Sequence, residues 1–266
     1  MKRSACALAL LLPACGSTGD HIVTFHAAAA GPADIGAGEF TNDRGFHVVL
    51  SRARLNIGAV YLNQTMPILG ANPTDCVLPG TYVGQVTQGM EVDLLSPALQ
   101  PFPADGEGTT LGARTGEVWY VRQAPAADGS AAQLDVNDPG TAAQVLALAG
   151  VADNGAQSFR FTANITIGAN RVVPSSNPAQ PGRNPICKQR IVSAIPLALA
   201  LTQNGTLVVR IDPRELLGRV DFSTLSADAN DPSAYVFADG PFANQASTTL
   251  YQLIEEGSPY RFAFMP

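Results

Sequence analysis

The clearest strand pattern of the chain is Ser158-Phe159-Arg160-Phe161-Thr162-Ala163-Asn164-Ile165-Thr166-Ile167. Its apolar side chains stand at every second position, which is the period of a β-strand with one buried and one solvent-facing side. A helix would need apolar residues three and four positions apart. We therefore interpret residues 158–167 as a half-buried strand.

The same period runs through residues 46–63, with one interruption. Val48 and Leu50 are apolar at even positions, whereas Ala53 and Leu55 are apolar at odd positions. One extra residue in a strand moves all later side chains to the other face. The change of parity predicts a β-bulge within residues 51–53.

Further apolar runs separated by turn signals predict more strands. They cover residues 22–25, 81–94, 116–122, 143–151, 190–202, 206–211 and 260–264. Gln203-Asn204-Gly205 lies between two of these runs and predicts a tight hairpin, because Asn-Gly readily takes positive φ angles. Residues 27–38 and the proline-rich residues 174–185 are expected to be loops.

Two short helices are expected beside the strands. Asp212-Pro213 is typical of a helix start and precedes residues 214–217, while Ser247 would open a helix over residues 250–256 that ends at Gly257. No internal repeat and no second linker divides residues 21–266. The prediction is one all-β domain, a single antiparallel β-sandwich of immunoglobulin-like or jelly-roll type.

The N-terminus has the pattern of a secretory signal. Lys2 and Arg3 precede an apolar run of eight residues, Ala5 to Leu12, and small residues follow. This run is far shorter than the roughly 20 residues that a membrane-spanning helix needs. We expect residues 1–14 to be a signal peptide and residues 15–20 a flexible tether.

The segment Leu12-Pro13-Ala14-Cys15-Gly16 resembles the lipobox of bacterial lipoproteins, with Pro13 in place of the usual small residue. The resemblance implies cleavage before Cys15, a lipid on its thiol, and sorting to the outer membrane of a Gram-negative cell. The alternative is ordinary cleavage that leaves Cys15 as a spare thiol. Both place the protein outside the cytoplasm.

The four cysteines sort by position. Cys6 lies in the removed segment and Cys15 at the anchor, so Cys76 and Cys187 remain in an oxidising compartment, 111 residues apart. Two such thiols are expected to form a disulfide. A reactive or metal-binding thiol pair is the alternative.

Three runs carry a wider resemblance: residues 45–55, residues 59–63, and Val209-Arg210-Ile211-Asp212-Pro213 with Val220-Asp221-Phe222. They resemble uncharacterised putative lipoproteins of myxobacterial type, which implies no known activity. The chain is also distantly similar to the copper-associated, MbnP-like periplasmic β-sandwich proteins. No metal-binding residue of that group matches a position in this chain.

Composition narrows the possible partners. The net charge of −6 argues against nucleic acid, which requires a basic surface. His26 and His47 could lie on neighbouring strands and bind copper together with Met66 or Met90. Acidic loops at residues 135–140 and at Asp228, Asn230 and Asp231, with Asp239 downstream, could bind calcium, although the same residues also favour turns.

The sequence patterns that could indicate a catalytic site are weaker than those that could indicate a metal site. Glu91 with Asp93 and Glu255 with Glu256 are paired carboxylates, but such pairs usually face solvent. Gly106-Glu107-Gly108 lacks the rest of a phosphate-binding loop. Trp119 and Tyr120, on a possible edge strand, are interpreted as core, with an aromatic binding platform as the alternative.

We therefore expect a non-catalytic cell-envelope protein that is anchored to a membrane by lipid, requires no cofactor, and binds an envelope protein or a surface ligand. A metal-binding lipoprotein, for copper or calcium, and a hydrolase with a dispersed site are the alternatives.

Overall fold

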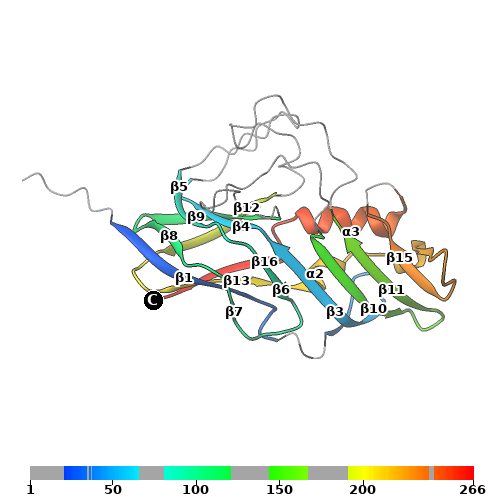
Figure 1. The fold of residues 1–266 in the computed structure, drawn as a ribbon. Helices are drawn as coiled ribbons and strands as arrows, with labels where there is room; N and C mark the ends of the chain where they lie inside the picture. The colour runs from blue at the N-terminus through cyan, green and yellow to red at the C-terminus, as the bar shows by residue number, and fades with distance from the viewer. Residues whose placement is uncertain are drawn as a thin grey trace, which may run out of the picture.

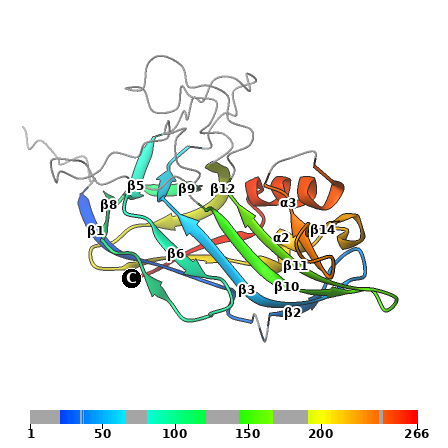
Figure 2. The same cartoon turned by 45° about the vertical axis from the view of Figure 1, so that its right-hand side comes forward.

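The computed structural model describes residues 21–34, 36, 38–65, 81–120, 144–166, 191–239 and 243–266, and strands dominate among them. The strands form two sheets, which lie side by side in Figures 1 and 2. The all-β class is confirmed.

The larger sheet has nine strands and is barrel-like. Its end strands β12 and β16 contact each other, so the sheet is nearly closed. In spatial order the strands are β12 (Ile191–Ala200), β9 (Gly112–Trp119), β4 (Ala59–Asn63), β5 (Tyr82–Val86), β8 (Gly106–Thr109), β1 (Ile22–Ala30), β13 (Thr206–Ile211) and β16 (Tyr260–Met265), with β7 (Gln100–Pro101) paired to β1.

The second sheet has seven strands. Their order is β14 (Ser226–Ala227), β15 (Ala234–Phe237), β11 (Ser158–Ile165), β10 (Leu146–Asp153), β3 (His47–Ile57) and β2 (Glu39–Thr41), with β6 (Met90–Asp93) paired to β3. Two pairs are parallel, β1 with β13 and β11 with β15. The predicted purely antiparallel arrangement is therefore wrong, and the two sheets, one of them nearly closed, do not clearly form the predicted single sandwich.

The predicted strand over residues 46–63 is two strands that belong to different sheets. β3 ends at Ile57 and β4 begins at Ala59, while the predicted strand over residues 81–94 likewise divides into β5 and β6. The two breaks meet, because a Cβ on Gly89 would lie 2.3 Å from the carbonyl oxygen of Ile57 and 2.8 Å from the Cα of Gly58. Two glycines thus let two paired chains bend at one corner, where a side chain would not fit.

The predicted bulge in β3 is confirmed. Arg52 pairs with Ala149 and Leu50 with Gly150, so Ser51 is the additional residue. Val48, Leu50, Ala53 and Leu55 are consequently all buried on one side. β11 shows the full alternation that its sequence predicts.

The hairpin prediction at Asn204 is wrong in part. Asn204 does take a positive φ of 61°. However, β13 pairs with β1 and β16 rather than with β12, and the backbone amide of Asn204 donates to Thr24 in β1. β1 also extends through Ala30, because the small alanines of this expected loop are paired with β13 and β7.

Both predicted helices are present. α2 (Pro213–Leu217) is capped by Asp212 as expected, and a 3-10 turn, η1 (Phe222–Thr224), follows it. α3 (Gln245–Glu255) starts earlier than predicted, because Asn244 is the N-cap and accepts the amide of Ser247 at 2.8 Å. The Ser247 hydroxyl instead accepts a hydrogen bond from the amide of Ala238.

Gly108 leaves space in the barrel-like sheet for the side chain of the core residue Leu201. A Cβ on Gly108 would lie 2.5 Å from Leu201 Cδ1 and 2.6 Å from the Val83 carbonyl oxygen, and the latter cannot move away. We expect Gly108→Ala to lower the free energy of unfolding by about 1–3 kcal/mol. In urea unfolding, the matched control Gly112→Ala should change it by less than about 0.5 kcal/mol, since a Cβ there meets only one atom at 3.9 Å. Equal effects would contradict this packing.

Candidate functional site

A polar and aromatic cluster lies on the side of β9 that faces away from the main core. Val118 and Tyr120 belong to the core, so the alternating residues Thr115, Glu117 and Trp119 point the other way. All three are nevertheless buried. β9 lies between β12 and β4, so the prediction that it is an edge strand is wrong.

Glu117 is at the centre of this cluster. Its Oε1 accepts hydrogen bonds from Asn63 Nδ2 at 3.2 Å and from the Ser193 hydroxyl at 3.4 Å, and its Oε2 accepts from Trp119 Nε1 at 3.0 Å. Three neighbouring strands, β4, β12 and β9, supply these donors. The side chain is 0 % exposed, and no Lys, Arg or His of the described residues forms an ion pair with it.

Burial without a cationic partner sets the acidity of Glu117. Removal from water disfavours the charged carboxylate and raises its pKa, although the hydrogen bonds from Trp119, Ser193 and Asn63 partly oppose this. The group therefore binds a proton more readily than an exposed glutamate does.

Three aromatic rings lie beside the carboxylate. Tyr61 pairs across the strands with Glu117, and its ring centroid is 4.9 Å from that of Trp119 and 5.4 Å from that of Tyr82. Burial, and then the charge of Glu117, raise the pKa of Tyr61 to about 12, and the pKa of Tyr82 is raised for the same reasons. We call Asn63, Thr115, Glu117, Trp119, Ser193, Tyr61 and Tyr82 the Glu117 cluster.

One buried polar atom of the cluster has no hydrogen-bond partner in the described part of the chain. Asn63 is 0 % exposed, and while its amide nitrogen donates to Glu117, its Oδ1 accepts no hydrogen bond from a described residue. An unsatisfied buried acceptor costs about 1–3 kcal/mol. A hydrogen-bond donor that reaches this oxygen would satisfy it.

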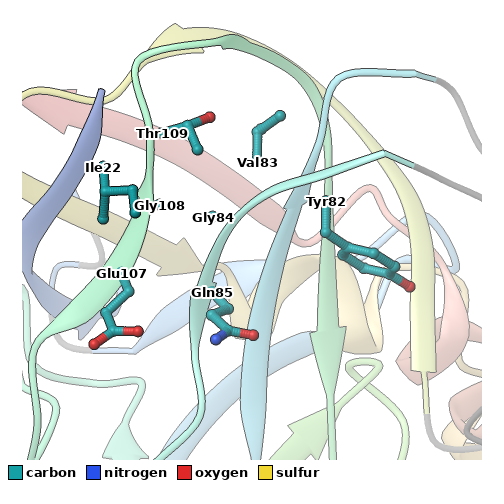
Figure 3. Close-up of a pocket in the computed structure, with 8 residues that line it drawn as sticks. All are labelled: Ile22, Tyr82, Val83, Gly84, Gln85, Glu107, Gly108 and Thr109. Carbon is teal, nitrogen blue, oxygen red and sulfur yellow. The ribbon is translucent and has the colours of Figure 1, made fainter. Parts of the chain in front are cut away.

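A shallow depression of about 280 Å³ adjoins the cluster, and Tyr82 belongs to both. Figure 3 shows the Tyr82 ring at one end of this depression and the Ile22 side chain at the other. The lining residues are Ile22, Tyr82, Val83, Gly84, Gln85, Glu107, Gly108 and Thr109. Tyr82, at 43 % exposed, is the solvent-facing member of the cluster.

The predicted copper ligands are not brought together. His26 is on β1 and His47 on β3, in different sheets, so the expectation that their strands are neighbours is wrong. His26 contacts Asp105 at 2.8 Å, and His47 contacts Glu39 at 3.1 Å. Met90 lies on β6, and Met66 is outside the described residues.

In the acidic loop at residues 228–231, the carboxylates make the hydrogen bonds of local turns. Asp228 accepts the amide of Asn230 at 2.7 Å, and Asp231 accepts from Ser233 and forms an ion pair with Arg160. The hydrogen bonds from Ser233, and then Arg160, lower the pKa of Asp231. Asp239 accepts the amide of Thr166 at 2.8 Å, and residues 135–140 lie outside the described part. Across the described residues, no three His, Cys, Asp or Glu side chains form a group that could hold a metal ion.

In each of the two carboxylate pairs noted in the sequence, the two members have different contacts. Glu91 forms an ion pair with Arg54 at 2.9 Å, whereas Asp93 accepts the amide of Leu95. Glu256 pairs with Arg219. Its neighbour Glu255 is half-buried, its buried Oε1 has no hydrogen-bond partner among the described residues, and burial raises its pKa to about 7.

Glu255 should therefore make stability fall with rising pH. Its pKa is about 7 in the folded chain and 4.5 as the ordinary value, so the folded state holds the proton more tightly. The stabilisation is complete below about pH 4.5 and is lost as pH rises through 7. We expect Glu255→Gln to raise the free energy of unfolding at pH 8 by at most about 3 kcal/mol, and to change it little at pH 4.

Urea unfolding across this pH range checks the expectation. Glu256→Gln is the matched control, because that side chain is 42 % exposed and pairs with Arg219, so its effect should stay below about 1 kcal/mol. An unchanged pH slope in Glu255→Gln would rule out Glu255 as its source.

Sequence reasoning noticed Trp119 but missed Glu117, Asn63, Tyr61, Tyr82 and Ser193. The one available signal was Glu117 itself, two residues before Trp119 on the same side of a strand flanked by apolar residues. Its partners come from strands far away in the sequence. Cys6, Cys15, Cys76 and Cys187 all lie outside the described residues, so the lipid anchor and the disulfide stay predictions.

Comparison with known proteins finds no matching family model, no similar curated protein and no similar solved structure. The site is therefore interpreted from its own geometry.

Proposed function

We propose that the chain is a lipid-anchored protein of the bacterial cell envelope that binds a ligand at the Glu117 cluster without transforming it chemically. The observation that carries this proposal is the buried carboxylate, held by three neutral donors beside three aromatic rings. Aromatic faces with a few convergent polar groups are typical of ligand sites.

Strand positions support binding at this place. The cluster draws on β12, β9, β4 and β5, four consecutive strands of one sheet, so its side chains are fixed by backbone pairing rather than by a loop. Sites built on strands hold their geometry better than sites on loops. The depression beside Tyr82 offers space for the part of a ligand that the cluster does not hold.

The anchor rests on the sequence around Cys15. No helix in the described residues is long and apolar enough to cross a membrane. In the proposal, acyl chains on Cys15 hold the protein at the membrane, and residues 15–20 connect them to the domain. Two or more acyl chains are enough for stable anchoring.

Cys15→Ser should abolish the anchor. We expect the variant to lose labelling by radioactive palmitate and to move from the detergent phase to the aqueous phase on Triton X-114 partitioning. Cys6→Ser is the matched control, because it changes a cysteine in the same segment and should be labelled normally. Normal labelling of Cys15→Ser would refute the anchor.

Trp119 makes the binding proposal directly measurable, because it is the only tryptophan of the chain. A screen of sugars, amines, carboxylates and short peptides should find a class that changes its fluorescence saturably, and Tyr61→Ala should weaken that response. If none of these classes changes the Trp119 fluorescence, the proposed site is refuted. Turnover of a bound compound, or stoichiometric copper or calcium in the purified protein, would refute the non-catalytic reading in favour of the hydrolase or the metal-binding alternative.

A further inference from the structure

The Glu117 carboxylate has hydrogen bonds but no counter-ion among the described residues. Its three donors, Asn63, Ser193 and Trp119, are all neutral. A buried ionised carboxylate without a cation is unfavourable, and neutral hydrogen bonds recover only part of the lost hydration. The cluster can remove the cost by taking up a proton or by taking up a cation.

The aromatic rings favour the cation. The faces of Trp and Tyr rings are electron-rich and attract an ammonium group within about 6 Å of the ring centre. Trp119, Tyr61 and Tyr82 form a continuous chain of ring contacts at 4.9 and 5.4 Å beside the carboxylate. Such contacts attract a cation more strongly where they are removed from water.

Asn63 determines which kind of cation fits. Its Oδ1 is buried and accepts no hydrogen bond from the residues that the structure describes, so a ligand donor can satisfy it. A primary ammonium has three N–H donors and can satisfy Asn63 and Glu117 together, whereas a quaternary ammonium has none. A metal ion would require more charged ligands than this cluster has.

We propose that the Glu117 cluster binds the protonated primary amine of a small organic ligand, between the Glu117 carboxylate, the Asn63 Oδ1 and the Tyr61, Tyr82 and Trp119 rings. This inference rests on the proposed function and names its ligand class. Tyr82 is the exposed side of the cluster, so the amine enters past this ring and the rest of the ligand lies in the adjoining depression.

The test uses n-pentylamine with the mature chain at neutral pH, followed by Trp119 fluorescence and by calorimetry. Pentyltrimethylammonium keeps the charge but lacks donors, and 1-pentanol keeps a donor but lacks the charge. We expect saturable binding of n-pentylamine, and binding weaker by about tenfold or more for each analogue. Equal binding of all three would show a merely apolar site and overturn the inference.

Variants separate the two contacts. Glu117→Gln should weaken n-pentylamine binding by about tenfold or more, and Asn63→Ala should remove the preference for n-pentylamine over the quaternary analogue. Tyr82→Ala changes an exposed position that folding tolerates, and it should weaken binding severalfold. It keeps the inference testable if a buried variant fails to fold. Glu39→Gln changes an exposed carboxylate of the other sheet and should bind as the wild type does. Unchanged affinity in Glu117→Gln would overturn the inference.

The outcome also separates this inference from the proposed function. If another class in the screen binds and depends on Tyr61 while n-pentylamine does not bind, the amine inference is wrong and the binding module remains. If no class binds, both are wrong.

Discussion

Phe222→Ala is expected to lower the free energy of unfolding by about 3–5 kcal/mol, as large aromatic truncations in a closed core do. Phe222 is in η1 and is 0 % exposed. Its ring centroid lies 4.9 Å from that of Phe161, 5.3 Å from that of Phe46 and 6.0 Å from that of Phe237. A cavity at this point would remove contacts from β11, from β15 and from the residue before β3 at once.

Urea unfolding followed by circular dichroism checks the size of the effect. Phe264→Ala is the matched control, because Phe264 is only partly buried and, among the described residues, meets a single ring, that of Phe25, edge-on at 6.1 Å. The control should lose about 1–2 kcal/mol, since less apolar surface is removed from water. Equal losses would contradict the packing of Phe222 against these three rings.

The sequence predicts this sheet well where the pattern is local. The alternation in β11 and the parity change at Ser51 depend only on neighbouring residues, and both agree with the structure. Asp212 and Pro213 likewise act on the helix that follows them directly. Such features can be recognised without knowing the partner strands.

Non-local pairing could not be predicted in this way. Asn204 makes its turn, but which strand receives the chain depends on β1, about 180 residues earlier, whose Thr24 accepts the Asn204 amide. The corner at Gly58 also involves a distant residue, because a Cβ on Gly89 would lie 2.8 Å from the Gly58 Cα. Apolar runs on both sides of Gly58 make one continuous strand the simplest prediction from the sequence.

The candidate site shows the same limit. Trp119 stands out in the sequence because it is the only tryptophan. Glu117 can be recognised as a site residue only from its hydrogen bonds with Asn63 and Ser193, which lie on strands before and after β9 in the sequence. From the sequence alone, Glu117 is expected at the surface because glutamate is almost never fully buried unless it is paired. Its burial follows from tertiary structure, which the period of one strand does not contain.

The predicted Cys76–Cys187 disulfide can be compared with the ends of the described strands. Cys187 lies four residues before Ile191 of β12, and Cys76 lies six residues before Tyr82 of β5. Ile191 pairs with Trp119, whereas Tyr82 pairs with Asn63, which pairs with Thr115. Three strand spacings and four residues along a strand put the two starts about 20 Å apart.

Chain length permits the bridge. Four and six extended residues reach about 14 and 20 Å, together well beyond the separation of the two strand starts. A disulfide needs the two Cα atoms within about 7 Å, which these lengths allow. The bridge would link the chain entering β12 to the chain entering β5, on either side of the strands that carry Glu117, Trp119 and Tyr61.

Replacing both cysteines, Cys76→Ser with Cys187→Ser, should therefore lower the free energy of unfolding by about 4–5 kcal/mol, the loop-closure entropy of a ring of about 110 residues. Wild-type protein treated with a reductant should show the same loss, while the reductant should not affect the double variant. Mass spectrometry after treatment with a thiol reagent tests the bridge directly. Cys76 and Cys187 should both be unmodified before reduction and both be modified after it. Two reactive thiols in the untreated protein would contradict the disulfide. The reactive or metal-binding pair would then be the reading to pursue, and the strands around Glu117 would depend on sheet pairing alone.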